Sequence, residues 1–337
     1  MSNGVASKHL HERSIVIDAL GNAPFTDRVR YFDKLVEAGV TAAVITATRS
    51  YDTPLEGMKR LREWYDLFDE QSEKIINVST SRDIERAKRE AKLGIILETQ
   101  NADILGDDLS LLPVYKRLGL RIIQPCYYAQ NLLGEGCGER TNGGLSNFGI
   151  EVVEEMNRLG LLVDVSHCGD QVTTDAIKYS SDPILITHSN PRGIVEHIRN
   201  KTDEHIKALA SKGGFIGLAA FSPFCEVRGD ARPTLEDFLD IVDYAVRLVG
   251  PDYVGLGLDL NPFMGEERFD TFARMYPGLK PRGGYLARTI FTNADGLDDL
   301  NRMLEITEGL VTRGYSDSDV EKILGLNFLR VFKEVCG

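Results

Sequence analysis

The sequence predicts an α/β protein of the (β/α)8, TIM-type barrel class, and two patterns along the chain indicate it. Short apolar, β-branched runs alternate with amphipathic helical stretches, which is typical of parallel βαβ units. Polar and ionisable residues also stand at or just beyond the ends of at least five of these runs. A closed barrel gathers the carboxyl ends of its strands at one mouth, so these residues would share one site. We expect the 337 residues to form a single barrel domain, residues 1–337.

The repeat of strand and helix can be followed along the chain. Eight apolar runs are the expected strands: residues 14–20, 40–46, 93–98, 120–126, 161–166, 183–188, 215–221 and 254–259. The stretches between them are long enough for helices, for example residues 27–38, 55–70, 84–92, 149–159, 203–211 and 234–248. A ninth run, residues 74–78, is expected to be a short extra strand or a helix end.

Two further helices are expected in the C-terminal residues 297–337. Ser316 is the expected N-cap of the second helix, because an acidic first turn and helical apolar spacing follow it. We expect this helix to close the outer ring of the barrel. An open, doubly wound sheet is the alternative fold, but no GxGxxG motif follows the first strand, and an open sheet would scatter the polar strand ends.

Composition excludes some classes of function. The net charge is −12 and the sequence pI is about 5.1, which disfavours a nucleic-acid partner because phosphate binding needs a basic patch. No signal peptide and no apolar stretch of membrane-spanning length is recognisable, so we expect no membrane association and a cytoplasmic location. The five cysteines are widely spaced and form no CxxC motif, which favours reduced thiols.

Four ionisable residues end four of the expected strands. His167 and His188 follow successive apolar runs, LLVDVSH and PILITH. Glu98 ends LGIILE, and Asp259 ends VGLGLD. A buried carboxylate is costly unless it is paired or bound to a metal, and a Glu/His/His/Asp set is the ligand chemistry of zinc or a similar divalent ion. Salt bridges to Arg199 or Lys201 are the alternative explanation.

Arg199 follows the strand of His188 by eleven residues, in the segment HIRNKTD. An arginine in a loop at the barrel mouth could bind a substrate carboxylate through a bidentate fork. A helix-capping or surface ion-pair role explains the same position equally well.

The motifs, taken in order, resemble the renal (membrane) dipeptidase family, peptidase family M19, of the amidohydrolase-like superfamily. The resemblance extends from residue 14 to residue 332. It rests on six segments: LGIILETQNA, GLSNFGIEVVEEMNRLGLLVDVSHCG, PILITHSNPRGI, HIRNKTDE, YVGLGLD and ILGLNFLRVF. Each is a weak signal alone, and six in the family's order are a strong one.

The resemblance implies a function and a set of roles. Glu98, His167 and His188 would hold one zinc ion, and Asp259 would orient or deprotonate the attacking water and carry a proton. Arg199 would bind a carboxylate of the substrate. The implied reaction is hydrolysis of a dipeptide or a related small carboxylated amide by a metal-activated water.

The sequence departs from the family at two places. The first strand of family members ends Asp-Gly-His-x-Asp, whose His and Asp bind a second zinc, whereas this chain has Leu20 and Asn22 there. We therefore expect about one zinc per chain and a weak or lost second site, for which Asn22 and Asp18 are the remaining candidates. Where the family commonly has a histidine, the segment CYYAQN offers Tyr127 as an oxyanion donor and substrate contact, and Asn131 as a second substrate contact.

Three functions remain open. The first is a mononuclear metal-dependent hydrolase, and the second is a lyase, an isomerase or a C–N bond-cleaving enzyme acting on an amino-acid derivative on the same scaffold. The third is a non-catalytic binding protein with a degenerate site. The expected partner is a small molecule with a carboxylate, and a homodimer is plausible from the family resemblance.

Overall fold

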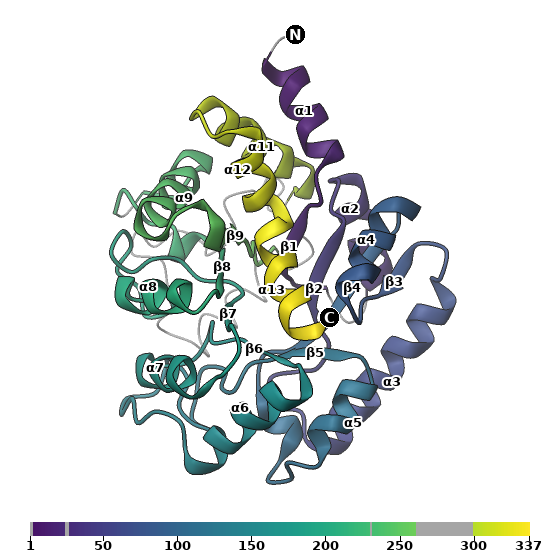
Figure 1. Cartoon of the computed structure of the whole chain (residues 1–337), viewed down its shortest axis with the longest axis vertical. Coiled ribbons are helices and arrows are strands. Elements are labelled where there is room, and N and C mark those ends of the chain that lie inside the picture. The colour runs from purple at the N-terminus through teal and green to yellow at the C-terminus, as the bar shows by residue number, and fades with distance from the viewer. Residues whose placement is uncertain (1–2, 24–26, 230, 261–298) are drawn as a thin grey trace.

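Parallel strands form the centre of the protein in a computed structural model that describes residues 3–23, 27–229, 231–260 and 299–337 (Figure 1). The strands are β1 (Ile17–Gly21), β2 (Ala42–Thr46), β3 (Ile75–Asn77), β4 (Leu93–Thr99), β5 (Leu120–Ile123), β6 (Leu162–Val163), β7 (Leu185–Ile186), β8 (Phe215–Leu218) and β9 (Val254–Leu256). Each predicted apolar run overlaps one of them, and the ninth run is the short strand β3.

The strands close into a ring. One sheet has the order β1-β2-β4-β5-β6, and a second has the order β7-β8-β9. Parallel bridges between Asp164 and Leu185 and between Gly21 and Leu260 connect the two sheets at both edges. Within the described residues these links join eight strands, while β3 pairs only with the start of β4. The predicted barrel is thereby confirmed, and the open-sheet alternative is wrong.

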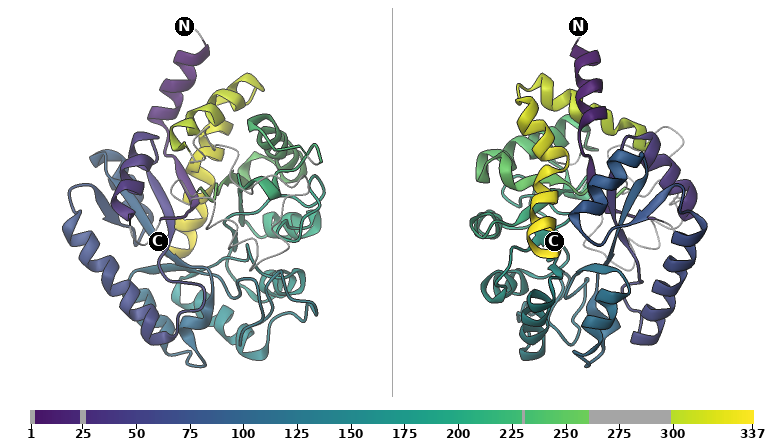
Figure 2. Two further views of the ribbon diagram at one scale, coloured as in Figure 1. Left: turned by 180° about the vertical axis from the view of Figure 1, so that it is seen from behind. Right: turned by 45° about the vertical axis from the view of Figure 1, so that its right-hand side comes forward.

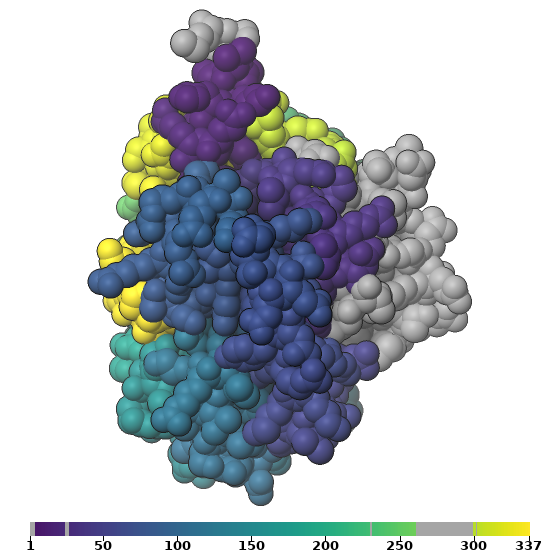
Figure 3. Space-filling model, turned by 90° about the vertical axis from the view of Figure 1, so that its right-hand side faces the viewer, coloured from purple at the N-terminus to yellow at the C-terminus, as the bar shows by residue number. Residues whose placement is uncertain are grey.

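Helices pack around the ring, most of them on its outer side, while the last one, α13, lies across it (Figures 1 and 2). They are α1 (Asn3–Arg13), α2 (Arg28–Glu37), α3 (Pro54–Glu70), α4 (Ser81–Glu90), α5 (Leu111–Arg117), α6 (Asn147–Leu159), α7 (Asp170–Tyr179), α8 (Asp203–Ser211), α9 (Leu235–Val249), α11 (Met303–Thr312), α12 (Asp317–Glu321) and α13 (Asn327–Cys336). Helix α1 projects at one end of the molecule, as Figure 3 shows, and packs against α11.

Local sequence explains where several helices begin. Thr53 caps α3 with a capping box to Glu56 and is followed by Pro54, whose fixed φ suits the first turn. Ser146 accepts the backbone N–H of Gly149 at the start of α6. Ser316 accepts the N–H of Asp319 at the start of α12, so the predicted N-cap is confirmed.

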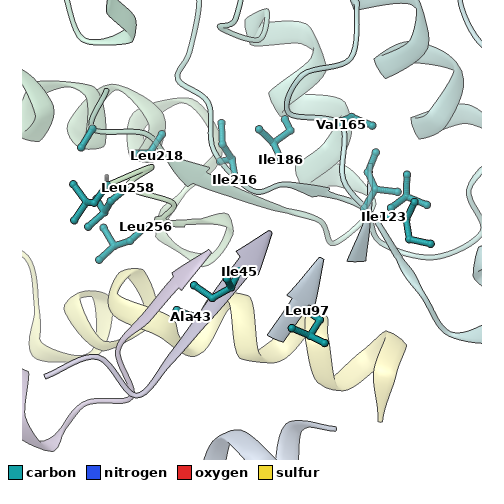
Figure 4. Packing of buried hydrophobic residues seen from close by; sticks show 14 of the residues in the cluster. Ala43, Ile45, Leu97, Ile123, Val165, Ile186, Ile216, Leu218, Leu256 and Leu258 are labelled. Atoms are coloured by element: carbon teal, nitrogen blue, oxygen red, sulfur yellow. The ribbon is translucent and has the colours of Figure 1, made fainter. Parts of the chain in front are cut away.

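Two shells of apolar side chains hold the barrel together. The inner shell lies inside the ring and includes Ile17, Val44, Ile96, Ile122 and Leu185. The outer shell lies between the strands and the helices, and Figure 4 shows its strand residues, from Ala43 and Ile45 on β2 round to Leu256 on β9. Because side chains alternate between the two faces of a strand, strands such as β2, β4 and β5 contribute to both shells.

The C-terminal helices depart from the prediction. A π-helical stretch, Lys322–Leu326, joins α12 to α13 without a break. Helix α13 does not stand in the outer ring; it lies across the ring of strands (Figure 1), with Phe328 and Phe332 packed into the inner apolar shell beside Phe215. The inner shell needs a cover at the end of the barrel opposite the polar mouth, and the apolar face of α13 supplies it.

None of the described helices is long and apolar enough to cross a membrane. All five cysteines are free thiols, as predicted, and four of them are buried.

Candidate functional site

The structure brings His167 and His188 together at the carboxyl ends of neighbouring strands. His167 lies four residues beyond β6 and His188 two residues beyond β7. Their Nε2 atoms are 2.9 Å apart, and both rings are buried. This is a hydrogen-bond distance between the two rings. Two histidine nitrogens bound to one tetrahedral zinc ion at about 2.0 to 2.1 Å would lie roughly 3.3 Å apart, so a small movement of the rings would make room for the metal.

Neighbouring polar groups hold the two histidines in place. The backbone N–H of His167 donates to Oε1 of Gln124, just beyond β5, at 2.9 Å. Nδ1 of His188 is 2.8 Å from the hydroxyl of Thr187. Nδ1 of His167, in contrast, is buried without a hydrogen-bond partner in the described part of the chain.

Glu98 lies on the inner face of β4. Ile96 belongs to the inner apolar shell, and the two-residue period of a strand places Glu98 on the same face, nearer the mouth. Its Oε1 accepts a hydrogen bond from Thr46 at 3.3 Å, whereas Oε2 is buried and has no partner among the described residues. A buried carboxylate oxygen without a donor is a candidate ligand for a cation.

Burial and charge favour the neutral forms of these groups. Burial lowers the pKa of His167 and of His188 well below the usual value, and the nearby cations Arg199 and Lys201 lower both further. Burial also raises the pKa of Glu98 well above its usual value, as does the neighbouring Asp164. Neutral imidazole is the form that binds a metal, so the histidine pair is ready to act as ligands at neutral pH.

Arg199 and Lys201 are buried cations close to the histidine pair. Arg199 donates to the backbone carbonyls of Ser166 and His188, and its Nε has no partner in the described structure. Lys201 donates to the carbonyl of Cys168 at 2.6 Å and to Thr173, and burial lowers its pKa to about 8. Neither forms an ion pair with a described carboxylate, so the alternative of salt bridges to the strand-end residues does not hold here.

Tyr127 lies against the histidine pair. Its ring stacks on that of His167, with ring centroids 4.1 Å apart. Asn131 lies in the same loop, but its side chain is occupied: Nδ2 donates to Asn101 and Pro125, and Oδ1 accepts the N–H groups of Leu133 and Gly134. The geometry therefore gives Asn131 a loop-stabilising role, and only Tyr127 of the two contacts a site residue.

The first strand and the chain after β9 meet at the mouth. Asn22 donates from Nδ2 to Oδ1 of Asp259, which has a left-handed backbone with φ of 57°. Asp18 is fully buried, and its Oδ1 accepts the N–H groups of Leu20 and Leu258. Its Oδ2 has no described partner, and burial raises its pKa to about 7. Leu20 is buried and offers no donor atom.

The described residues provide part of a binding site for one metal ion. Within residues 3–23, 27–229, 231–260 and 299–337, no three His, Cys, Asp or Glu side chains already form a group that could hold a metal ion. The two histidines are paired through their Nε2 atoms, and Oε2 of Glu98 is a buried oxygen without a partner among the described residues. The participation of Glu98 stays a prediction.

Sequence reasoning missed four polar residues around the histidines. Asp164 is fully buried and accepts hydrogen bonds from Ser166 and Thr187, and Gln124 bonds the backbone of His167. Each interrupts or ends an apolar strand run, LLVDVS, PILITH or LRIIQPC. A polar residue inside a buried run was therefore the signal that could have identified them.

A small hollow opens beside this site. It has a volume of about 360 Å³, and its wall includes Cys137 and the ion pair of Arg192 with Asp170. The backbone N–H of Cys137 donates to the carbonyl of His167 at 2.7 Å. A residue in the wall of the hollow is therefore hydrogen-bonded directly to the backbone of His167.

Fold and site together define an amidohydrolase-like barrel. The structure matches that of an amidohydrolase from Pseudomonas aeruginosa with a TM-score of 0.85 and 35% sequence identity, covering 98% of each chain. More narrowly, the chain belongs to the membrane dipeptidase family, peptidase family M19, which it matches over residues 9–271 and 288–336. The resemblance inferred from the six motifs is confirmed.

Two further comparisons concern the fold and the sequence in turn. The probable dipeptidase PvdM from Pseudomonas aeruginosa has the same fold, with a TM-score of 0.82 at 22% identity over 99% of this chain and 98% of that one. Dipeptidase tcpJ of Claviceps purpurea is 27% identical over 82% of this chain and 58% of its own length. The chain thus spans little more than half the length of some curated fungal relatives.

Proposed function

We propose that this protein is a mononuclear zinc-dependent hydrolase that cleaves a dipeptide or a related small amide with a free carboxylate. The observation that carries the proposal is the pair of buried histidines with Nε2 atoms 2.9 Å apart, beside a buried arginine. Family membership supports the reaction class, because the family is one of metal-dependent peptidases.

The proposed roles follow from what each side chain can do. His167, His188 and Glu98 would hold zinc, which when bound polarises a carbonyl and lowers the pKa of water. Arg199 binds the substrate carboxylate, because its buried charge has no described counterion and a carboxylate can accept from the planar guanidinium.

Two other residues serve the reacting amide. Asp259 takes a proton from the attacking water and returns it to the leaving amine, since a carboxylate held by Asn22 keeps an oxygen in a fixed direction. Tyr127, stacked on His167, donates its hydroxyl hydrogen bond to the oxygen that gains charge in the transition state. Tyr127 is uncharged, so we expect a weaker oxyanion contribution than a charged donor would make.

One zinc per chain is proposed because the first strand lacks the ligands of a second site. Leu20 cannot ligate a metal, and Asn22 donates its amide to Asp259. Asp18 is already used by two backbone N–H groups. The same replacements at the first strand also support the second candidate function, a lyase or other C–N bond-cleaving enzyme on this scaffold. Such an enzyme would turn over a carboxylated metabolite and would not hydrolyse dipeptides.

Metal analysis is the deciding experiment. Plasma mass spectrometry of the purified protein should give about one zinc per chain, and His188→Ala should lose it. The exposed histidine His9 supplies the control, because His9→Ala should keep the full metal content. Absence of zinc from the wild type, with no uptake on addition, would contradict the proposal, and two zinc ions would show that a second ligand set exists.

Activity then separates the two candidate reactions. The zinc-loaded protein should hydrolyse members of a dipeptide panel to free amino acids. Turnover of other carboxylated metabolites, with every dipeptide left intact, would favour the second candidate instead.

A further inference from the structure

One buried carboxylate next to the site is not among the expected metal ligands. Asp164 lies just beyond β6 and is fully buried. Its Oδ1 accepts from the hydroxyl of Ser166 at 2.7 Å and from the backbone N–H of Thr187 at 2.8 Å. Its Oδ2 accepts from the hydroxyl of Thr187 at 2.9 Å. Every one of these partners is a donor, as an ionised carboxylate requires.

The direction of the Thr187 hydrogen bond determines what His188 can do. The hydroxyl carries one proton, and that proton is donated to Asp164. Only lone pairs of Thr187 Oγ1 remain for its other neighbours, among them Nδ1 of His188 at 2.8 Å. Nδ1 must therefore be the N–H donor of this ring, which leaves a lone pair at Nε2.

We propose that Asp164, acting through Thr187, is a positioning device that holds His188 in the Nδ1–H tautomer and presents its Nε2 lone pair for zinc. The proposal rests on the proposed function, because it assigns a purpose to the lone pair that the metal would use. Ligating histidines commonly donate their second nitrogen to a carboxylate, and here a threonine hydroxyl stands between the two.

The network acts on one member of the histidine pair. His167 is held by its backbone N–H on Gln124 and by stacking on Tyr127, and its Nδ1 has no partner among the described residues. His188 is bonded at Nδ1 and faces His167 with Nε2. With Nδ1 of His188 protonated, His167 must be the donor in the 2.9 Å hydrogen bond between the two Nε2 atoms, so in the metal-free protein the tautomer of His167 follows from that of His188.

A purely structural role for the same groups makes different predictions. Asp164 also accepts backbone N–H groups of Ser166 and Thr187, which ties the ends of β6 and β7 together. If this were its whole purpose, loss of the Thr187 hydroxyl would change stability and leave the tautomer and the zinc affinity unaltered.

The test compares Thr187→Val with Thr187→Ser. Valine keeps the branched shape and removes the hydroxyl, while serine keeps the hydroxyl. Zinc affinity, measured by competition with a chromogenic chelator, should fall by about 10- to 100-fold in Thr187→Val. Thr187→Ser should recover most of this loss.

A matched control lies at the other end of the protein. The hydroxyl of Thr307 is 2.7 Å from Nδ1 of His11, so Thr307→Val removes the same kind of contact from a histidine outside the site. That variant should bind zinc as the wild type does. Unaltered zinc affinity in folded Thr187→Val would overturn the proposal.

A second readout needs no metal. Nitrogen-15 NMR of the histidine rings in the chelator-treated protein should show the Nδ1–H tautomer of His188 in the wild type and in Thr187→Ser, and its loss in Thr187→Val. An Nε2–H tautomer in the wild type would overturn this inference alone. A wild type that takes up no zinc would instead contradict the proposed function.

Discussion

Arg199, the proposed contact for the substrate carboxylate, carries a buried charge. Its guanidinium is 1% exposed and donates to two backbone carbonyls, with no described carboxylate to balance its charge. An uncompensated buried charge is costly. The proposed substrate carboxylate would supply the opposite charge.

Replacement of Arg199 by lysine tests this role. Lysine keeps the charge but loses the planar fork, so one charge-assisted hydrogen bond worth about 1.5 to 3 kcal/mol should be lost. We expect kcat/KM for a dipeptide to fall by about 10- to 100-fold. The same dipeptide with its carboxylate amidated is the control, and an equal fall for both substrates would contradict carboxylate binding by Arg199.

The stability of the protein should depend on pH through Asp18. Burial raises its pKa from 3.8 to about 7, so the folded protein holds a proton between these values that the unfolded chain has lost. Stability due to this group should therefore fall as the pH rises from 4 to 7. Asp18→Asn removes this titratable group. Between pH 5 and pH 8 the free energy of unfolding of the wild type should therefore fall by roughly 2 to 4 kcal/mol relative to that of Asp18→Asn. Urea unfolding of the metal-free proteins at both pH values measures the difference, and an identical pH dependence would refute the assignment.

At the scale of the element, the strand ends of β7, β8 and β9 are packed backbone against backbone. A Cβ atom added at Gly257 would lie 1.7 Å from the carbonyl oxygen of Thr187, and one added at Gly217 would lie 2.1 Å from it. Real atoms do not approach so closely. The two glycines therefore allow the chain before His188 to sit at its observed place in the ring.

Gly257→Ala should consequently disturb the site. We expect a loss of at least about 1 to 3 kcal/mol in the free energy of unfolding, because the strands must move apart. Zinc uptake should fall with it, since Thr187 precedes His188. Gly4→Ala, in helix α1 with its nearest neighbour 3.9 Å from the added carbon, is the control: it should leave zinc uptake unaltered, and it should not lower the free energy of unfolding because alanine is the better helix former. Wild-type stability of Gly257→Ala would argue against this packing.

At the scale of the whole molecule, the C-terminal helix α13 packs its apolar side chains into the inner shell of the barrel. Phe328 packs edge-on against Phe215 at 5.4 Å between ring centroids and stacks on Phe332. The inner shell therefore includes residues from both ends of the sequence, with Ile17 on β1 and Phe328 on α13 in one cluster.

Phe328→Ala should destabilise the entire barrel rather than the C-terminus alone. Truncation of a buried phenylalanine costs about 3 to 5 kcal/mol. The matched control is Leu326→Ala, because Leu326 is 37% exposed on the neighbouring turn. Urea unfolding followed by circular dichroism should show one cooperative transition at a lower midpoint for Phe328→Ala only. Separate unfolding of the C-terminal helices would contradict the role of α13 in the common core.

The amino-acid sequence alone was sufficient to predict the barrel, and it predicts a site at the ends of the barrel's strands. Apolar runs with a two-residue period and helices between them are local properties, and so is the placement of Glu98, His167 and His188 at the ends of buried strands. The order of the motifs was sufficient to identify the family. Leu20 and Asn22 could likewise be recognised as departures from it without any structure.

The tertiary structure alone decided how these residues are paired. The contact of Asn22 with Asp259 joins residues 237 positions apart, and the bond of Thr187 with Asp164 joins residues 23 positions apart on two strands. The place of α13 across the ring also depends on the shape of the inner shell, which no local pattern contains. Periodicity states which face of an element a side chain occupies, but only the closed ring brings particular atoms within hydrogen-bond distance, because that distance is set by strands far apart in the chain.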